Sequence, residues 1–133
     1  MIEITKGTPS QNTPDYDRAV RAVIVHEGEV VLMYLKPSDT YVLPGGGVHR
    51  GESLEHALKR EVLEETGYTV KDYQKMLVIH EHHDPVYRKH IIYKVTVGND
   101  VNQINLTEEE KALGMEKITL PIEEAIQRLA FHQ

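Results

Sequence analysis

The segment from Gly46 to Tyr68, GGVHRGESLEHALKREVLEETGY, constrains the fold of this chain more than any other. Ser53 is a good helix N-cap, because its hydroxyl can accept a hydrogen bond from an amide of the first turn. The run 54–66 contains no Gly or Pro and is rich in residues that favour or tolerate a helix. Gly67 stands where helices commonly end in a left-handed residue. The sequence therefore predicts a helix over 54–66.

Three glutamates of this helix are placed where apolar residues are expected. On a helical wheel, at about 100° per residue, one stripe carries the apolar residues Leu54, Ala57, Leu58 and Val62. Glu61 and Glu65 fall near the centre of that stripe, and Glu64 falls at its edge. Like charges three and four residues apart cost a helix about 0.2–0.5 kcal/mol per pair, and unpaired buried carboxylates cost more. A bound divalent cation removes both penalties, so we favour a metal site over a solvated acidic face.

The loop before the helix, Leu43-Pro44-Gly45-Gly46-Gly47, also favours a ligand site. Glycine has no Cβ, so the backbone can approach a ligand closely. An ordinary tight turn is the alternative for such a loop considered alone. Beside the glutamates, Gly46 and Gly47 are candidate substrate-binding residues.

The segment resembles the Nudix box of Nudix hydrolases, G-x5-E-x7-R-E-U-x-E-E-x-G-U, in which U is a bulky apolar residue. The matching residues are Gly46, Glu52, Arg60, Glu61, Val62, Glu64, Glu65, Gly67 and Tyr68. Tyr68 is a slightly polar version of the last apolar position. A looser resemblance, in strands, loop placement and a final helix, extends over most of the chain.

The resemblance implies hydrolysis of a nucleoside diphosphate linked to another group, with Mg²⁺ as the usual metal and Mn²⁺ as an alternative. It implies that Glu61, Glu64 and Glu65 ligate the metal and that the Gly45 carbonyl is a further ligand. One of these glutamates, preferably Glu61, would also deprotonate the attacking water.

The resemblance assigns supporting roles to three more residues. Arg60 would orient Glu61 through a salt bridge, and Arg60, Glu61 and Glu64 form the expected catalytic set. Glu52 would hold the geometry between the loop and the helix, and Gly67 would end the helix. These roles agree with phosphoryl-transfer chemistry, which depends on metal ions, positioning and electrostatics.

A further acid outside the box often completes the metal site in relatives. Among the acids at 108–110 we favour Glu110 for this role, by its spacing to the final strand. A solvated acidic helix start, favoured by the helix macrodipole, is an equal alternative. Glu116 is a weaker candidate.

A second polar group lies at 80–90. Its histidines are His80, His82, His83 and His90. His80 and His82 would share one face of an extended strand, and a zinc site is an alternative to a border of the substrate cleft. Arg88 is the best single candidate for phosphate, because its fork matches phosphate oxygens. Tyr87 is a candidate to stack on a base, although core or surface packing is the default expectation for it as for the other tyrosines.

Strand and helix signals predict the architecture of the chain. We expect strands at 18–26 and 30–35, joined as a hairpin, and at 76–80, 90–97 and 116–120. We expect loops at 37–40 and 81–89, a short helical turn at 107–110, and a closing amphipathic helix at 122–130. Strands interleaved with two helices indicate an α/β fold, the Nudix-type α/β/α sandwich with a mixed β-sheet between helices.

Size and composition limit the functional classes. The 133 residues are enough for a single domain, 1–133, with 1–14 as an irregular lead-in. There is no cysteine, which excludes thiol chemistry. No segment has the length and apolarity of a membrane span or a signal peptide, so we expect a cytoplasmic protein.

The net charge of −6 argues against a general nucleic-acid surface. It also means that an anionic substrate must meet cations at the site. A small-molecule nucleotide is the expected partner, and a homodimer is compatible with the resemblance.

Two other functions compete with metal-dependent nucleotide hydrolysis. One is a Nudix-fold sensor that binds a nucleotide without turning it over, although such proteins commonly have damaged boxes. The other is an RNA 5′-end pyrophosphohydrolase, which the acidic balance and the absence of a basic, aromatic-lined tract disfavour. The substrate itself stays open, because its recognition comes from loops outside the box.

Overall fold

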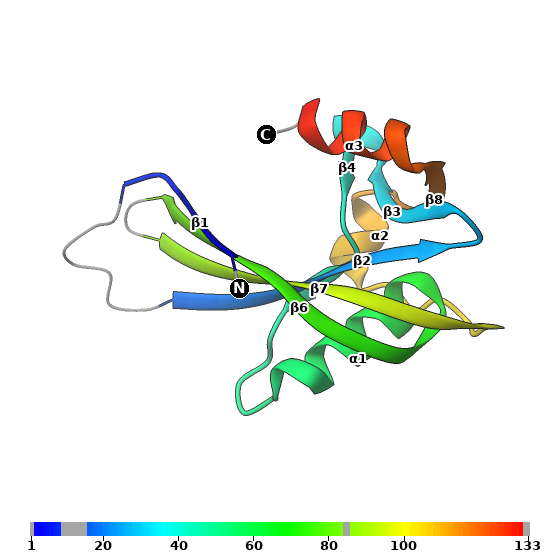
Figure 1. Cartoon of the computed structure of the whole chain (residues 1–133), viewed down its shortest axis with the longest axis horizontal. Helices are drawn as coiled ribbons and strands as arrows, with labels where there is room; N and C mark the ends of the chain where they lie inside the picture. Colours follow the sequence, from blue (N-terminus) through cyan, green and yellow to red (C-terminus); the bar gives the residue numbers. More distant parts are fainter. Residues whose placement is uncertain (1, 9–15, 84–85, 132–133) are drawn as a thin grey trace.

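The computed structural model describes residues 2–8, 16–83 and 86–131. Its elements, in chain order, are β1 (Ile2–Lys6), β2 (Tyr16–His26), β3 (Glu29–Leu35), a 3-10 turn (Lys36–Ser38), β4 (Thr40–Val42), β5 (Gly45–Gly47), α1 (Leu54–Thr66), β6 (Tyr68–His83), β7 (Val86–Val101), α2 (Glu108–Ala112), β8 (Met115–Pro121) and α3 (Ile122–Phe131) (Figure 1). None of the helices in these ranges combines the length and apolarity needed to cross a bilayer.

The strands form one mixed sheet in the order β1-β6-β7-β2-β3-β4, with β5 also paired to β2 and β8 to β3. The pairs β1–β6 and β2–β7 are parallel, and β6–β7, β2–β3 and β3–β8 are antiparallel. Helix α1 lies on one side of the central strands, and α3 lies on the other side, over β3 and β4 (Figure 1). The expected α/β/α sandwich around a mixed sheet is therefore confirmed.

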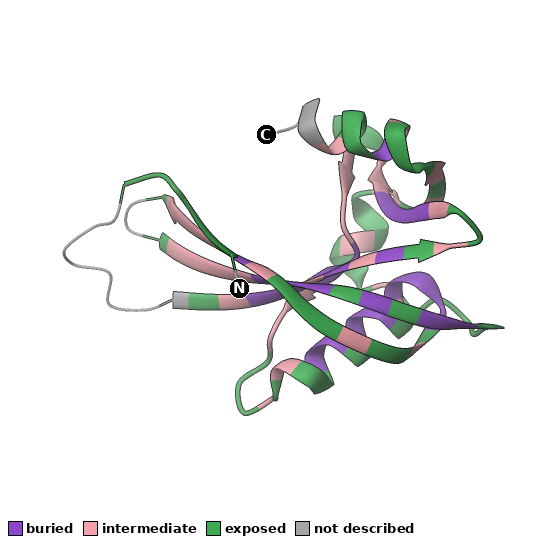
Figure 2. Ribbon diagram, in the orientation of Figure 1, coloured by how far each residue is buried: buried purple, intermediate pink, exposed green. Residues whose placement is uncertain are grey.

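Two apolar cores attach the helices to the sheet. Ala57, Leu58 and Val62 of α1 are fully buried against residues of the central strands, among them Val20 and Ile91. Ala125 of α3 is buried in a second cluster with Val30 and Leu32. Figure 2 shows the buried positions gathered where α1 meets the sheet. The first core fixes α1, and with it every glutamate that α1 carries.

Both ends of α1 lie where the sequence predicts them. The Ser53 side chain accepts a hydrogen bond from the His56 amide at 3.1 Å. Gly67 adopts a left-handed φ of 79°, and its amide donates to the Leu63 carbonyl at 2.9 Å. A Cβ at Gly67 would meet the Asn102 carbonyl oxygen at 2.4 Å, so both the backbone conformation and the space there require glycine.

The expected irregular lead-in is wrong for Ile2–Lys6, which form β1 and pair in parallel with 77–81 of β6. Residues 9–15 lie outside the described part of the chain. The expected loop at 81–89 is also wrong, because β6 extends to His83 and β7 begins at Val86; 84–85 are outside the described residues. Pairing with β1 and β2 provides hydrogen bonds for these polar strand ends. The strands at 18–26, 30–35, 76–80, 90–97 and 116–120 and the closing helix lie within observed elements. The expected turn at 107–110 is the start of α2, with Thr107 as its N-cap.

Candidate metal and phosphate site

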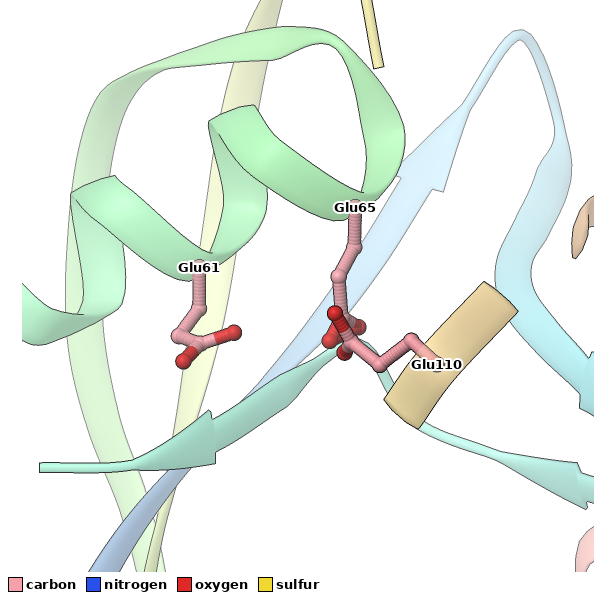
Figure 3. Close-up of side chains that lie close together, drawn as sticks. All are labelled: Glu61, Glu65 and Glu110. Carbon is pink, nitrogen blue, oxygen red and sulfur yellow. The ribbon is translucent and has the colours of Figure 1, made fainter. Parts of the chain in front are cut away.

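Three carboxylates from two helices converge beside the glycine loop. Glu61 and Glu65 come from α1 and Glu110 from α2, and one oxygen of each lies within 4.8 Å of the others (Figure 3). Glu61 and Glu65 are buried and Glu110 is half-buried. Among the described residues this is the one group of three or more potential metal ligands. The histidines at 80–83 and 90 therefore form no such group in the described chain.

Glu65 is the most deeply buried acid of the cluster. Its Oε1 accepts a hydrogen bond from the Gly45 amide at 3.2 Å, whereas its buried Oε2 has no hydrogen-bond partner among the described groups. Burial raises the pKa of Glu65 to about 9, against the lowering effect of the Gly45 amide, and the neighbouring Glu110 and Glu61 raise it further. Burial also raises the pKa of Glu61, which Arg60 partly offsets. The cluster thus favours protons or a cation over free charge.

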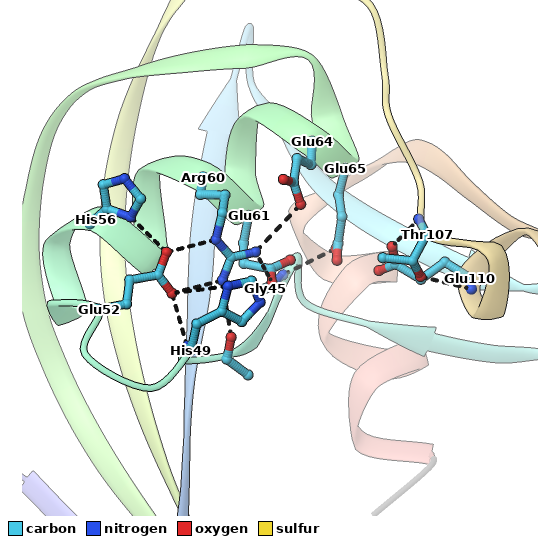
Figure 4. Close-up of polar contacts among 11 residues, drawn as sticks. Gly45, His49, Glu52, His56, Arg60, Glu61, Glu64, Glu65, Thr107 and Glu110 are labelled. Carbon is cyan, nitrogen blue, oxygen red and sulfur yellow. Dashed lines mark hydrogen bonds and ion pairs between the residues drawn. The ribbon is translucent and has the colours of Figure 1, made fainter.

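Arg60 joins the helix to the glycine loop. Its Nη1 donates to Glu61 Oε1 at 2.8 Å, its Nε donates to Glu52 Oε2 at 2.7 Å, and its Nη2 donates to the Gly47 carbonyl at 3.1 Å (Figure 4). The salt bridge between Arg60 and Glu61 that the resemblance implies is thus present in the structure.

Glu52 completes this network from the loop side. Besides the two bonds from Arg60, it accepts a hydrogen bond from the His49 amide at 2.9 Å. The Arg60 guanidinium holds the pKa of Glu52 well below its usual range, so Glu52 is ionised at neutral pH. Its contacts agree with the expected role in holding the loop against the helix.

Glu64 lies at the rim of the cluster rather than within it. Its Oε2 is 3.4 Å from Arg60 Nη1, and 30% of its side chain is exposed. The two other acids of the sequence-predicted ligand set, Glu61 and Glu65, are brought together with Glu110 instead. Glu64 shares with Glu61 the same guanidinium nitrogen, and so lies next to the cluster.

Glu110 is fixed by the first turn of α2. Its Oε1 accepts a hydrogen bond from the Thr107 amide at 2.9 Å, and its own amide donates to Thr107 Oγ1 at 3.2 Å. This reciprocal pair is a capping box. Glu116, the weaker candidate, pairs with Lys36 at 3.9 Å and is not in the cluster.

Gly46 leaves the space that the Glu61 carboxylate occupies. A Cβ at Gly46 would lie 2.7 Å from Glu61 Oε1 and 2.8 Å from Glu61 Cδ, so a side chain there would displace this carboxylate. A Cβ at Gly47 would meet nothing within 4 Å. The two glycines of the predicted loop therefore have different functions, and only Gly46 is needed to seat Glu61.

Arg21 of β2 is a functional candidate that sequence reasoning missed. Its Nη1 donates to the Leu43 carbonyl at 3.3 Å. Burial lowers the pKa of Arg21, while Glu65, Glu61 and Glu81 raise it. The sequence carries a signal for it, because Arg21 interrupts an otherwise apolar run, AVRAVIV, and a largely buried arginine needs anions around it.

A cavity of about 320 Å³ begins at Arg21 and is bordered by one face of the sheet, including β4, and by helix α3. Its lining residues are Lys6, Arg21, Tyr41, Val42, Leu43, Ile79, Glu81, His90, Ile92 and Leu129. Arg21 thus lines this cavity and is also near enough to Glu65 and Glu61 for their charges to raise its pKa.

The two substrate-binding residues expected from β7 face opposite sides of the sheet. Tyr87 stacks between His80 and His82, with ring centroids at 5.8 and 4.6 Å. Odd-numbered residues of β7 such as Ile91 and Tyr93 belong to the core under α1, so alternation places Tyr87 away from the cavity. Arg88 lies on the cavity side, near enough to Arg21 to lower its pKa.

A family model described as the NUDIX domain matches residues 15–133. Two Bacillus subtilis proteins are similar in sequence. One, provisionally named an 8-oxo-dGTP diphosphatase, is 41% identical over 54 residues, which is 40% of this chain and 36% of that protein. The other, provisionally named the ADP-ribose pyrophosphatase YjhB, is 27% identical over 100 residues, 74% of this chain and 47% of that protein. The matches thus span less than half the length of either curated relative.

Among solved structures, a NUDIX hydrolase from Nitrosomonas europaea has the same fold. Its TM-score is 0.72 at 22% identity, over 87% of this chain and 79% of that one. The layered sheet and the acid-bearing helix beside a glycine loop define an α/β/α protein with a carboxylate cluster at its first helix. With the family model matching most of its length, the chain belongs to the Nudix hydrolase family.

Proposed function

We propose that this protein hydrolyses a pyrophosphate bond in a nucleoside diphosphate linked to another group, with a divalent cation held by Glu61, Glu65 and Glu110. The observation that carries the proposal is the convergence of these three carboxylates within 4.8 Å. Mg²⁺ is the proposed metal and Mn²⁺ the alternative. Glu64 at the rim and the Gly45 carbonyl are proposed as additional ligands.

The donor set fits a hard cation. All three clustered side chains offer oxygen, as Mg²⁺ and Mn²⁺ prefer. The buried Glu65 Oε2 has no hydrogen-bond partner among the described groups, and an unpartnered buried polar atom is costly. When bound, the cation neutralises charge on the phosphate oxygens and makes a water nucleophilic.

Protein side chains then orient one another around the reacting phosphate, and one of them accepts a proton. Arg60 donates to Oε1 of Glu61, which fixes the carboxylate and leaves Oε2 to accept the proton of the attacking water. Glu52 holds Arg60 in place from the loop side. In our proposal Glu61 is therefore the general base, and Arg60 and Glu52 are positioning residues.

Arg21 and the adjoining cavity provide a place for the rest of the substrate. The guanidinium matches phosphate oxygens, and the cavity beyond it is large enough for part of a nucleotide. Arg88 is a second proposed phosphate ligand on the same face of the sheet. The provisional names of the two Bacillus subtilis relatives both refer to nucleotide pyrophosphate bonds, which supports a small nucleotide as substrate.

A hydrolysis screen tests this function. Nucleoside triphosphates, dinucleoside polyphosphates, nucleotide sugars, ADP-ribose and triphosphorylated RNA are incubated with protein and Mg²⁺, Mn²⁺ or chelator. We expect turnover of one small-molecule class that chelator abolishes. Binding of nucleotides without turnover of any compound would contradict the proposal and favour a sensor.

A further inference from the structure

The 320 Å³ cavity is lined by one ionised acid that is not part of the metal cluster, Glu81. We propose that Glu81 selects guanine, by accepting hydrogen bonds from N1–H and N2–H of a base seated in the cavity. This inference rests on the proposed function only for the nature of the ligand, a nucleotide whose phosphates lie at the metal cluster.

The order of residues along the cavity sets the direction of the nucleotide. Arg21 of β2 is within electrostatic reach of Glu61 and Glu65, and Glu81 lies two strands away from it, on β6 beyond β7. The walls of the cavity include apolar residues, with Ile79 and Ile92 on the sheet. The other apolar lining residues are Tyr41, Val42, Leu43 and Leu129. Such walls match the flat faces of a base better than the hydroxyl-covered ribose.

Glu81 presents an acceptor at the polar edge of this cavity. Its Oε1 lies 3.2 Å from Nε2 of His90, and its Oε2 lies 3.8 Å from Nε2 of the exposed His83. Contact with His90 lowers the pKa of Glu81, so the carboxylate is charged at neutral pH. Burial lowers the pKa of His90, so this imidazole is neutral and does not cancel the charge.

A charged carboxylate distinguishes the purines by their hydrogen-bonding edges. Guanine offers two adjacent N–H donors, hypoxanthine offers one, and adenine turns the lone pair of N1 toward the same position. Lys6 stands opposite Glu81 in the parallel register of β1 and β6 and lines the same cavity. Its ammonium is a donor suited to the O6 of guanine, which adenine lacks. The expected order of affinity is guanine, hypoxanthine, adenine.

The test measures binding of nucleoside monophosphates, which contain no pyrophosphate bond to hydrolyse. Calorimetry with Mg²⁺ compares GMP, IMP and AMP on the whole protein and on Glu81→Gln. Glutamine offers one acceptor and one donor, which match adenine. We expect wild-type protein to prefer GMP over AMP by roughly 10- to 100-fold, and Glu81→Gln to reduce that ratio at least about tenfold.

Matched controls separate recognition of the base from general effects on nucleotide affinity. Glu27→Gln changes an acid whose side chain is 82% exposed, and should leave the GMP to AMP ratio as in wild type. The ratio of dGMP to GMP affinity should be the same in wild type and Glu81→Gln. Three results would overturn the proposal. They are equal weakening of GMP, IMP and AMP binding by Glu81→Gln, a change in the ratio of dGMP to GMP affinity in that variant, and no binding of any monophosphate by wild-type protein.

The outcome is separate from that of the hydrolysis screen. Guanine-selective binding without turnover would leave the role of Glu81 in place and contradict the hydrolase. Metal-dependent turnover without base preference in wild-type binding would leave the hydrolase in place and overturn the role of Glu81.

Discussion

At the scale of single residues, the central fact is that Glu65 is buried with an unpartnered oxygen. Burial and two neighbouring carboxylates make its charge costly, as its raised pKa shows. Arg60 does not relieve it, because that guanidinium is engaged by Glu52, Glu61 and Glu64. The cation that we propose for this cluster would offset the cost of burying this carboxylate.

We predict that Glu65→Gln lowers kcat for the best substrate by at least about 10²-fold, because it removes a charge that stabilises the transition state through the metal. The fold should survive, since the amide is neutral and nearly isosteric. Steady-state kinetics and thermal unfolding check both statements. Glu55→Gln, which changes an exposed acid that pairs with Lys59 and contacts Tyr73, is the control, and a fully active Glu65→Gln protein would contradict the assignment.

The glycine loop offers a matched pair of variants. Gly46→Ala should displace Glu61, because its Cβ would meet the carboxylate at 2.7 Å, and we expect metal affinity to fall by roughly 10-fold or more. Gly47→Ala, whose Cβ meets nothing within 4 Å, should keep the affinity. Calorimetric titration with Mg²⁺ or Mn²⁺ measures the metal affinity of both variants. An equal loss of affinity in both would contradict the role of the space at Gly46.

Residues also show how far the sequence predicts the site. Glu61 and Glu65 could be placed from the helix period, since their inward direction follows from position alone. Glu110 could be placed only by spacing, because no local pattern brings α2 to α1. Arg21 and Glu81 were not predicted as site residues, since strand alternation does not say which face of the sheet borders a cavity.

At the scale of elements, α1 and α2 each contribute carboxylates to the cluster, and the two helices are held in place in different ways. Helix α1 is anchored by a buried stripe of Ala57, Leu58 and Val62. Helix α2 has no buried residue and is held at its start by the capping box of Thr107 and Glu110. The position of the Glu110 side chain therefore depends on this cap.

We predict that Thr107→Ala raises the Mg²⁺ concentration for half-maximal activity by roughly 3- to 10-fold. The reason is that losing the cap costs about 1 kcal/mol locally and loosens Glu110. Thr119→Ala, which removes a hydrogen bond to Glu29 on the exposed surface of β8, is the control. An unchanged Mg²⁺ dependence in Thr107→Ala would mean that Glu110 needs no support from α2.

Helices and strands differed in how well they could be predicted. The limits of α1 followed from Ser53 and Gly67, because capping is a local property. Strand β1 and the outer parts of β6 and β7 were missed, because the polar run 81–89 and the short IEITK segment have weak local preferences. Their extended conformation comes from pairing with neighbouring strands, which sequence patterns do not show.

At the scale of the whole molecule, the acid cluster links stability to pH and metal. In the metal-free protein burial raises the pKa of Glu65 from its ordinary value of 4.5 to about 9. A raised pKa means that the folded state prefers the protonated acid. The stability from this group is therefore complete below about pH 4.5 and is lost as pH rises through 9.

We predict that the Tm of chelator-treated protein falls between pH 5 and pH 9 more steeply than that of Glu65→Gln. Added Mg²⁺ should raise the wild-type Tm most at pH 9, because binding requires the deprotonated carboxylate. Differential scanning calorimetry across this range measures both effects. Parallel curves for wild type and Glu65→Gln would refute the coupling.

The most direct test of the metal site is Mn²⁺ binding followed by electron paramagnetic resonance, which needs no knowledge of the substrate. We predict that wild-type protein removes free Mn²⁺ from solution. We also predict that Glu65→Gln and Glu110→Gln bind Mn²⁺ at least about 10-fold more weakly, while Glu55→Gln matches wild type. Undiminished Mn²⁺ binding by Glu65→Gln would contradict the claim that the carboxylates of α1 and α2 hold the catalytic cation.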